Sequence, residues 1–175
     1  MKKILYILLT ISIVFSACKK EEGCTDPIAI NYNADAEDDD GSCNYPPSFQ
    51  VSMPSAITGS ASTQPGFISH LTVTNVSHKT LNVGCRINPI SQPDNTVFTF
   101  CWGGLCYAEG TLVAINTVSM ISNETLASPD LPAHSGYYQA NGNKDDIAVI
   151  EYCFYDDDNP TDETCFTVTF DPTPK

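Results

Sequence analysis

The eight cysteines of this chain are the feature that most limits how it can fold. A disulfide requires two Cα atoms within about 7 Å, so each pair excludes every fold that holds its cysteines apart. Whether the thiols pair depends on the compartment, because disulfides persist mainly outside the cytosol. The N-terminus predicts export, since two lysines precede an apolar run from Ile4 to Phe15 and small residues follow. That run is short for crossing a bilayer, so we expect residues 1–17 to be a cleaved signal peptide.

Cys18 follows this segment directly. The stretch FSAC, residues 15–18, resembles the bacterial lipobox, with Phe15 where leucine is usual. The resemblance implies that Cys18 becomes the lipidated first residue of the mature chain, carrying palmitate-type acyl chains that hold it to a membrane. The following KKEE resembles the export signal of Bacteroidota surface lipoproteins. We therefore expect residues 18–22 to form a lipidated tether at the outer membrane, exposed on the cell surface.

The charge balance excludes one large class of partners. The chain carries 21 acidic and 8 basic residues, a formal net charge of −13 at pH 7. Such a surface repels nucleic acid, because binding requires cations that neutralise phosphates. We therefore expect no nucleic-acid partner, and we expect the surface to attract divalent cations.

With Cys18 assigned to lipid, seven cysteines remain. Cys24 and Cys43 enclose an acidic stretch and pair most simply with each other. Cys101 and Cys106 flank WGGL, and the two glycines allow the chain to fold back between them. An odd number leaves one cysteine without an intramolecular partner.

The alternation of side chains along strands sorts the other three cysteines. In TLNVGCRI, Cys85 shares the face of the alternating apolar side chains and points into a core. In IAVIEYCFY and TCFTVTF, Cys153 and Cys165 lie opposite the apolar faces. We therefore predict a Cys153–Cys165 disulfide on an outer face and Cys85 as a buried free thiol. The rival pairing of Cys85 with Cys153 requires this alternation to be misassigned.

From residue 46 onward the sequence predicts an all-β domain. Segments rich in Val, Ile, Thr, Phe and Tyr alternate with turn signals such as QPG and NGNKDD. Eight segments are expected as strands: residues 49–53, 67–76, 80–87, 96–102, 111–121, 135–140, 146–155 and 164–170. This pattern favours one β-sandwich of the immunoglobulin or fibronectin type III kind over residues 46–175, with a small barrel as the alternative. The prolines of YPPS mark a linker after a disulfide-stapled module, residues 23–45.

That module, GCTDPIAINYNADAEDDDGSCNY, resembles a short module that recurs in Bacteroidota extracellular proteins. Its pattern is GCTDP, then A-x-NYNP, then DDGSC, and Ala34 replaces the usual proline. The β-region more weakly resembles surface domains of the same bacteria, through a CWGxCY-type motif at residues 101–107 and DDDNPTD at 156–162. Those domains often precede a type IX secretion sorting domain, whereas only DPTPK follows the last expected strand. The resemblance implies a lipid-anchored surface protein with an adhesion or accessory role.

Calcium is the one cofactor that the sequence suggests. Five side chains of the module are candidate ligands: Asp26, Asn31, Asn33, Asp39 and Asp40. Their oxygens are hard donors, and DDG resembles the tight turns of calcium loops, although no Glu closes a twelve-residue EF-hand loop. The alternative, which we favour, is that these Asp and Asn residues cap turns in a stapled knot. The acidic turn at residues 156–163 is expected to be a solvated hairpin loop.

The sequence gives little support for catalysis. The three histidines lack zinc-binding spacing, and the sequence contains no nucleophile elbow, phosphate loop or dinucleotide glycine pattern. We therefore expect a non-enzymatic protein, and a hydrolase ranks last. Trp102, with Tyr107 nearby, is the candidate binding residue. It is either a core residue or an exposed recognition tip, and we expect partial burial.

These observations predict an outer-membrane lipoprotein that acts as a binding or accessory module for a surface or outer-membrane protein partner. A structural spacer without a specific ligand is the first alternative. A calcium-dependent adhesion module is the second. An exposed Trp102 would favour binding, whereas a buried Trp102 would favour the spacer.

Overall fold

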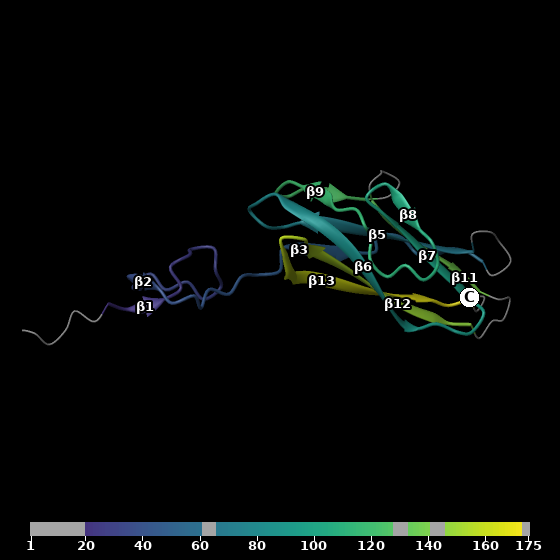
Figure 1. Cartoon of the computed structure of the whole chain (residues 1–175), viewed down its shortest axis with the longest axis horizontal. Coiled ribbons are helices and arrows are strands. Elements are labelled where there is room, and N and C mark those ends of the chain that lie inside the picture. Colours follow the sequence, from purple (N-terminus) through teal and green to yellow (C-terminus); the bar gives the residue numbers. More distant parts are fainter. Residues whose placement is uncertain (1–19, 61–65, 128–132, 141–145, 173–175) are drawn as a thin grey trace, which may run out of the picture. The chain divides into compact units, whose positions relative to one another are not determined.

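The computed structural model describes residues 20–60, 66–127, 133–140 and 146–172. The expected signal peptide and Cys18 lie outside these ranges. The chain divides into two compact units, Met1–Pro46 and Pro47–Lys175, at the expected linker. Figure 1 shows the larger unit as an assembly of strands coloured blue to yellow. The described ranges contain β-strands and no helix, which confirms the all-β class.

The small unit is a knot with little regular structure. Its strands β1 (Glu22–Gly23) and β2 (Asp38–Asp39) pair in parallel. Only two of its described apolar residues, Cys24 and Ala29, are buried. Units below about 40 residues usually need a disulfide or a metal to stay folded, because they bury too little apolar surface. The disulfide between Cys24 and Cys43, with Cα atoms 4.7 Å apart, provides this support.

The larger unit consists of two antiparallel sheets. One sheet has the order β10-β5-β11-β7-β8, and β3 and β4 also pair with β5. Its strands are β3 (Phe49–Ser52), β4 (Thr58–Gly59), β5 (Phe67–Asn75), β7 (Val97–Trp102), β8 (Leu105–Tyr107), β10 (Thr125–Leu126) and β11 (His134–Gln139). The other sheet has the order β13-β12-β6-β9. Its strands are β6 (Leu81–Ser91), β9 (Val118–Met120), β12 (Ala148–Asp156) and β13 (Asn159–Phe170).

The core lies between the sheets because alternate residues of each strand face inward. In β5 this alternation is complete: Phe67, Leu71 and Val73 are buried, and the residues between the buried positions are half-buried. In β12, Ile150 and Tyr152 are fully buried on the same inner face. The alternating apolar residues of the sequence therefore form the interior of the sandwich, as predicted.

Trp102 lies deep in this core. It is 0% exposed, and its indole N–H donates a hydrogen bond to the Val83 carbonyl at 3.1 Å. Its ring packs at a tilt on Phe154, with 5.1 Å between the ring centroids. A buried aromatic side chain of this size contributes a large apolar area, and its polar N–H is satisfied here. Trp102 is therefore fully buried, whereas the sequence predicted partial burial.

The three expected disulfides are present. Cys101 and Cys106 are directly opposite each other in the β7–β8 hairpin, and Cys153 and Cys165 are opposite each other across β12 and β13. Cys85 is a buried free thiol. The structure thus confirms the alternation used to choose among the pairings, and it rules out the rival Cys85–Cys153 bridge.

The expected strand at residues 111–121 is wrong in part. Only Val118–Met120 forms a regular strand, β9, and Val113 makes an isolated antiparallel bridge to Arg86 of β6. The interruption lies at Asn116, whose N–H donates to the Tyr107 hydroxyl at 3.3 Å. Its side-chain amide also reaches the Gly103 carbonyl, at 3.5 Å. These bonds to the β7–β8 hairpin divert the backbone from continuous pairing with β6.

Candidate functional sites

The candidate calcium ligands of the small unit are engaged in its turns. The carboxylates of Asp26, Asp39 and Asp40 each accept a hydrogen bond from the backbone N–H two residues later, at 2.9–3.0 Å. Asn33 accepts a hydrogen bond from the backbone in the same way. Asn31 ties the ends of the knot, donating to the Ser42 carbonyl and accepting from the Asn44 N–H, both at 2.7 Å. These are the local side-chain to backbone bonds expected of a stapled knot.

The three carboxylates do not converge. Among the described residues, one group of three or more His, Cys, Asp or Glu ligand atoms lies within 4.8 Å of one another, and it contains none of Asp26, Asp39 and Asp40. The hydrogen bonds from Ser42 lower the pKa of Asp40 below its ordinary value. Each carboxylate instead accepts a hydrogen bond within its own turn, as the favoured stapled-knot alternative predicts, and calcium binding stays a prediction.

The grouped ligand atoms belong to Glu151, Cys153 and Cys165. The two sulfurs form a disulfide, so neither is available as a thiolate ligand. The carboxylate of Glu151 accepts a hydrogen bond from Asn88 at 3.3 Å. This cluster is a structural bridge on the outer face of β12 and β13, and it offers no metal site in the oxidised protein.

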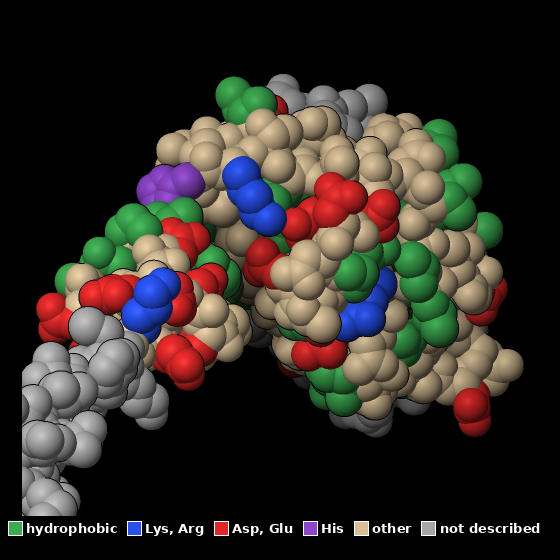
Figure 2. Space-filling view, turned by 60° about the vertical axis from the view of Figure 1, so that its left-hand side comes forward, with side chains coloured by type: hydrophobic (Ala, Val, Ile, Leu, Met, Phe, Trp, Pro, Cys, Tyr) green, Lys and Arg blue, Asp and Glu red, His purple; other side chains and the backbone are tan. Residues whose placement is uncertain are grey.

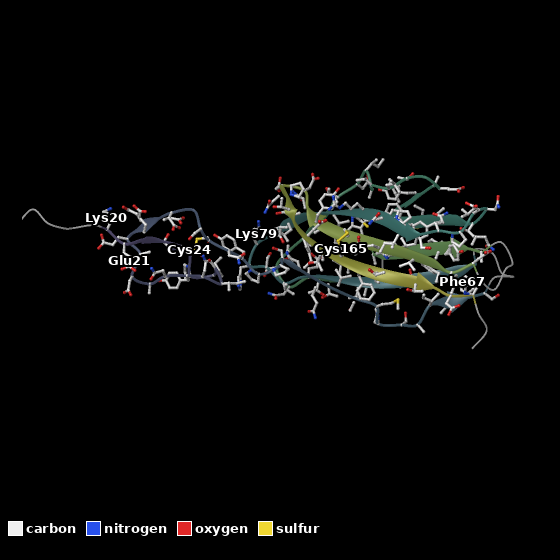
Figure 3. The ribbon with its side chains drawn as sticks, turned by 90° about the horizontal axis from the view of Figure 1, so that it is seen from below. Lys20, Glu21, Cys24, Phe67, Lys79 and Cys165 are labelled. Atoms are coloured by element: carbon white, nitrogen blue, oxygen red, sulfur yellow. A yellow bond between two sulfur atoms is a disulfide. The ribbon has the colours of Figure 1, made fainter. Side chains whose placement is uncertain are left out.

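The expected tether is partly folded into the small unit. Lys20 forms an ion pair with Asp38 at 2.9 Å, and the Glu21 carbonyl accepts from the N–H of Glu37 at 2.8 Å. Glu22 already belongs to β1. Figure 3 shows Lys20 and Glu21 together with Cys24 in this unit. Residues 20–22 therefore belong to the folded small unit, and the boundary expected at Gly23 was placed too late.

Neither candidate binding aromatic is accessible. Trp102 is a core residue, and Tyr107 is also buried, stacked on Phe100 with 4.8 Å between ring centroids. The disulfide-closed hairpin displays Leu105 at its tip instead. Of the two alternatives for Trp102, the structure therefore shows the core residue, because inward-facing positions of β7 and β8 carry the rings of Trp102 and Tyr107 into the sandwich.

The acidic hairpin between β12 and β13 is only partly solvated. Asp157 and Asp158 are exposed, but Asp156 is buried and pairs with the Lys79 ammonium at 3.4 Å. Asp162 binds the hydroxyl and N–H of Ser48, where the larger unit begins. Figure 2 shows how acidic side chains gather around the few lysines and arginines of the surface. Two of these carboxylates therefore hold the fold and are not free for a ligand.

A buried histidine lies between the sheets, and the sequence analysis did not single it out. His134 of β11 is fully buried, and among the described residues neither of its ring nitrogens has a hydrogen-bond partner. Its ring meets Tyr152 edge-on, with 4.2 Å between centroids. Burial lowers the pKa of His134 to about 3, and the nearby His70 adds to the effect. Extending the 135–140 strand by one residue would have placed His134 on the buried face of Tyr138.

Little in the described ranges suggests catalysis. The Nδ1 atom of His70 lies 3.1 Å from the Ser135 hydroxyl, but within the described residues no carboxylate is bonded to that ring to orient it. Burial raises the pKa of the Cys85 thiol, which disfavours the nucleophilic thiolate. The described part of the chain contains no helix long and apolar enough to cross a membrane.

The two packed antiparallel sheets define an immunoglobulin-like β-sandwich. The chain is similar in structure to the N-terminal domain of PorA, with a TM-score of 0.52 and 15% identity over 72% of this chain and 99% of that one. Weaker matches are a FixG-related protein from Vibrio parahaemolyticus (TM-score 0.45, 10% identity, 71% of this chain and 95% of that one) and a PapD-like domain of human CEP192 (0.39, 11%, 73% and 87%). No family model and no curated protein matches the sequence. At these identities the similarity to PorA shows the fold alone.

Proposed function

We propose that this protein is a lipid-anchored module of the outer membrane, displayed at the cell surface, that binds or supports a protein partner and catalyses no reaction. The sandwich fold and the three disulfides support an exported module of this kind. The scarcity of activated nucleophiles or acid–base pairs among the described residues supports a non-enzymatic role.

The observation that carries the proposal is the place of Cys18 in the sequence, two residues before Lys20. One residue separates Cys18 from Lys20, which is already paired with Asp38 of the small unit. An extended residue spans at most about 3.6 Å, so a lipid on Cys18 would hold the small unit directly at the membrane surface. Two or more acyl chains on one residue give stable anchoring, which a single chain does not.

The anchor is tested with Cys18→Ala in the native host. We expect this variant to lose labelled palmitate and to leave the membrane fraction, or to retain its signal segment. Ser16→Ala is the matched control, because it keeps a small residue before Cys18 and should remain anchored. Membrane retention and unchanged mass in Cys18→Ala would refute the lipid anchor.

A structural spacer is the second candidate, and the burial of Trp102 and Tyr107 favours it. The two candidates are separated by affinity purification of the tagged chain from native outer membranes. A protein that copurifies in stoichiometric amounts, and is lost in a surface variant that still folds, supports the binding role. Recovery of the chain alone after mild crosslinking supports the spacer.

A further inference from the structure

Among the described residues, no strand pairs with the outer side of one edge of the four-stranded sheet, and this edge carries no charge. The segment Leu112–Ser119, here called the 112–119 edge, runs beside β6 on the side away from β12. No Asp, Glu, Lys or Arg occurs between Thr111 and Asn123. Edge strands usually carry charges, prolines or covering elements that prevent another strand from pairing with them. The 112–119 edge has neither a charge nor a proline, and the β7–β8 hairpin contacts it at Asn116, where its pairing with β6 is interrupted.

The backbone at this edge is presented for pairing. The Ile87 N–H donates to the Leu112 carbonyl at 2.8 Å, and the Ala114 N–H donates to the Cys85 carbonyl at 2.9 Å. In an antiparallel pair, the residue between two such bonds turns its own N–H and C=O to the opposite side. Val113 therefore directs both groups away from β6, toward the open side of the sheet.

The side chains of this edge are apolar and exposed. Ile115 is 82% exposed, Leu112 is 51% exposed and Val113 is 50% exposed. Ala114, between them, faces the core and is buried. A single exposed apolar residue is ordinary, whereas three within four residues, on an edge with free backbone groups, form a surface suited to strand addition.

Acidic residues stand at both ends of the uncharged run. Glu109 is exposed in the turn before it, where the Thr111 N–H bonds to the Ala108 carbonyl. Glu124 lies in the turn after it, and its carboxylate accepts a hydrogen bond from the Ile121 N–H at 2.8 Å. An added strand would therefore meet apolar surface at its centre and negative charge near its ends.

We propose that the 112–119 edge accepts an extended segment of a partner protein as an additional antiparallel strand, with apolar side chains at alternate positions and Lys or Arg near both ends. Main-chain hydrogen bonds to Val113 supply affinity, and contacts to Ile115 and Leu112 supply selectivity. A second copy fits less well, because antiparallel pairing of two such edges brings Glu109 of one copy toward Glu124 of the other. Each chain also carries a net charge of −13. This inference rests on the binding role proposed above and not on the lipid anchor.

The test measures hydrogen exchange of the purified full chain with two synthetic probes. One is the peptide KTVTVTVTK, and the other is ETVTVTVTE. We expect the lysine-ended probe to slow exchange of amides in the 112–119 edge, with weaker binding at high salt because the end contacts are exposed. The glutamate-ended probe should bind about tenfold more weakly, equivalent to about 1.4 kcal/mol.

Three variants locate the site. Val113→Pro removes an outward N–H without breaking a bond to β6, and Ile115→Lys introduces the kind of charge that protects natural edges. Both should lower affinity about tenfold or more. Ile147→Lys is the matched control, because Ile147 is also exposed but lies just before β12, on the other side of β6. It should bind as the wild type does, and melting curves confirm that each variant folds.

Three results would overturn the proposal. The first is equal binding of the lysine-ended probe to Ile115→Lys and to the wild type. The second is an absence of protection in the 112–119 edge with saturating probe. The third is a dimer of the wild type that Ile115→Lys dissociates, which would assign the edge to a second copy. An unanchored but peptide-binding chain would refute only the lipid anchor.

Discussion

Removing the buried imidazole of His134 should change how stability depends on pH. In the folded protein the pKa of His134 is lowered to about 3, whereas an unfolded histidine has a pKa of about 6.5. The unfolded chain therefore binds a proton that the folded chain excludes. Stability from the neutral ring is fully present above pH 6.5 and is lost as the pH falls from about 6.5 toward 3.

The magnitude follows from the burial of the ring. It packs between β11 and β12, and the titratable groups that face it are His70 of β5 and Tyr152 of β12. Phe154 of β12 completes its apolar surroundings. One unit of pKa corresponds to about 1.4 kcal/mol, so acidification from about pH 7.5 to about pH 5 should cost about 2 kcal/mol through this residue alone. His134→Phe should abolish that cost and should be at least as stable at neutral pH, because no ring nitrogen is left buried without a partner.

The assay is urea unfolding of the wild type and His134→Phe at about pH 7.5 and about pH 5. His78→Gln is the control, since His78 is exposed and its loss removes a histidine without touching the core. Carboxylates titrate in all three proteins, so the difference between them isolates His134. If the wild type and His134→Phe lose the same stability on acidification, burial does not keep the His134 ring neutral.

Four further outcomes are expected. Cys24→Ser should remove about 3 kcal/mol of loop-closure stabilisation from the small unit and unfold it, which proteolysis of the knot with an intact sandwich would show. Cys85 should resist a thiol reagent until denaturant is added, and rapid labelling of the native protein would contradict its burial. Gly136→Ala should cost about 1–3 kcal/mol, measured by thermal melting, because a Cβ there would lie 1.9 Å from the Tyr152 hydroxyl. Asp40→Asn should leave the difference in melting temperature between calcium and chelator unchanged. A stabilisation by calcium that this variant loses would support a calcium site at Asp40.

Much of the fold was predictable because its signals are local. The alternation of apolar residues around Cys153 and Cys165 predicts which face of each strand meets the core, and the folded sheet has the same faces inward. The two glycines between Cys101 and Cys106 likewise predict the hairpin, because they allow the chain to reverse locally. The strand at 111–121 was misjudged because its interruption depends on Asn116 meeting Tyr107 and Gly103, which are brought near only by folding.

The candidate sites were less predictable, because a site depends on where side chains from different strands converge. Asp26 and Asp40 resemble calcium ligands in the sequence, but in the structure one oxygen of each accepts a hydrogen bond from the backbone N–H two residues later, and neither is grouped with other ligand atoms. Trp102 resembles a recognition residue in a glycine-rich hairpin, but the inward face of β7 buries it against Phe154. In both cases the residue type was suggestive and the surroundings decided its role.

The sequence by itself determined the all-β class, the division near Pro46 and the pairing of six cysteines, because composition, periodicity and spacing along one segment carry that information. Only the tertiary structure decided that Trp102 is core and, within the described part of the chain, that the His134 ring is buried without a hydrogen-bond partner and that no strand pairs with the outer side of the 112–119 edge. The reason is physical: burial and edge exposure are properties of how sheets pack and which strands lack a neighbour, and no local stretch of the chain contains them.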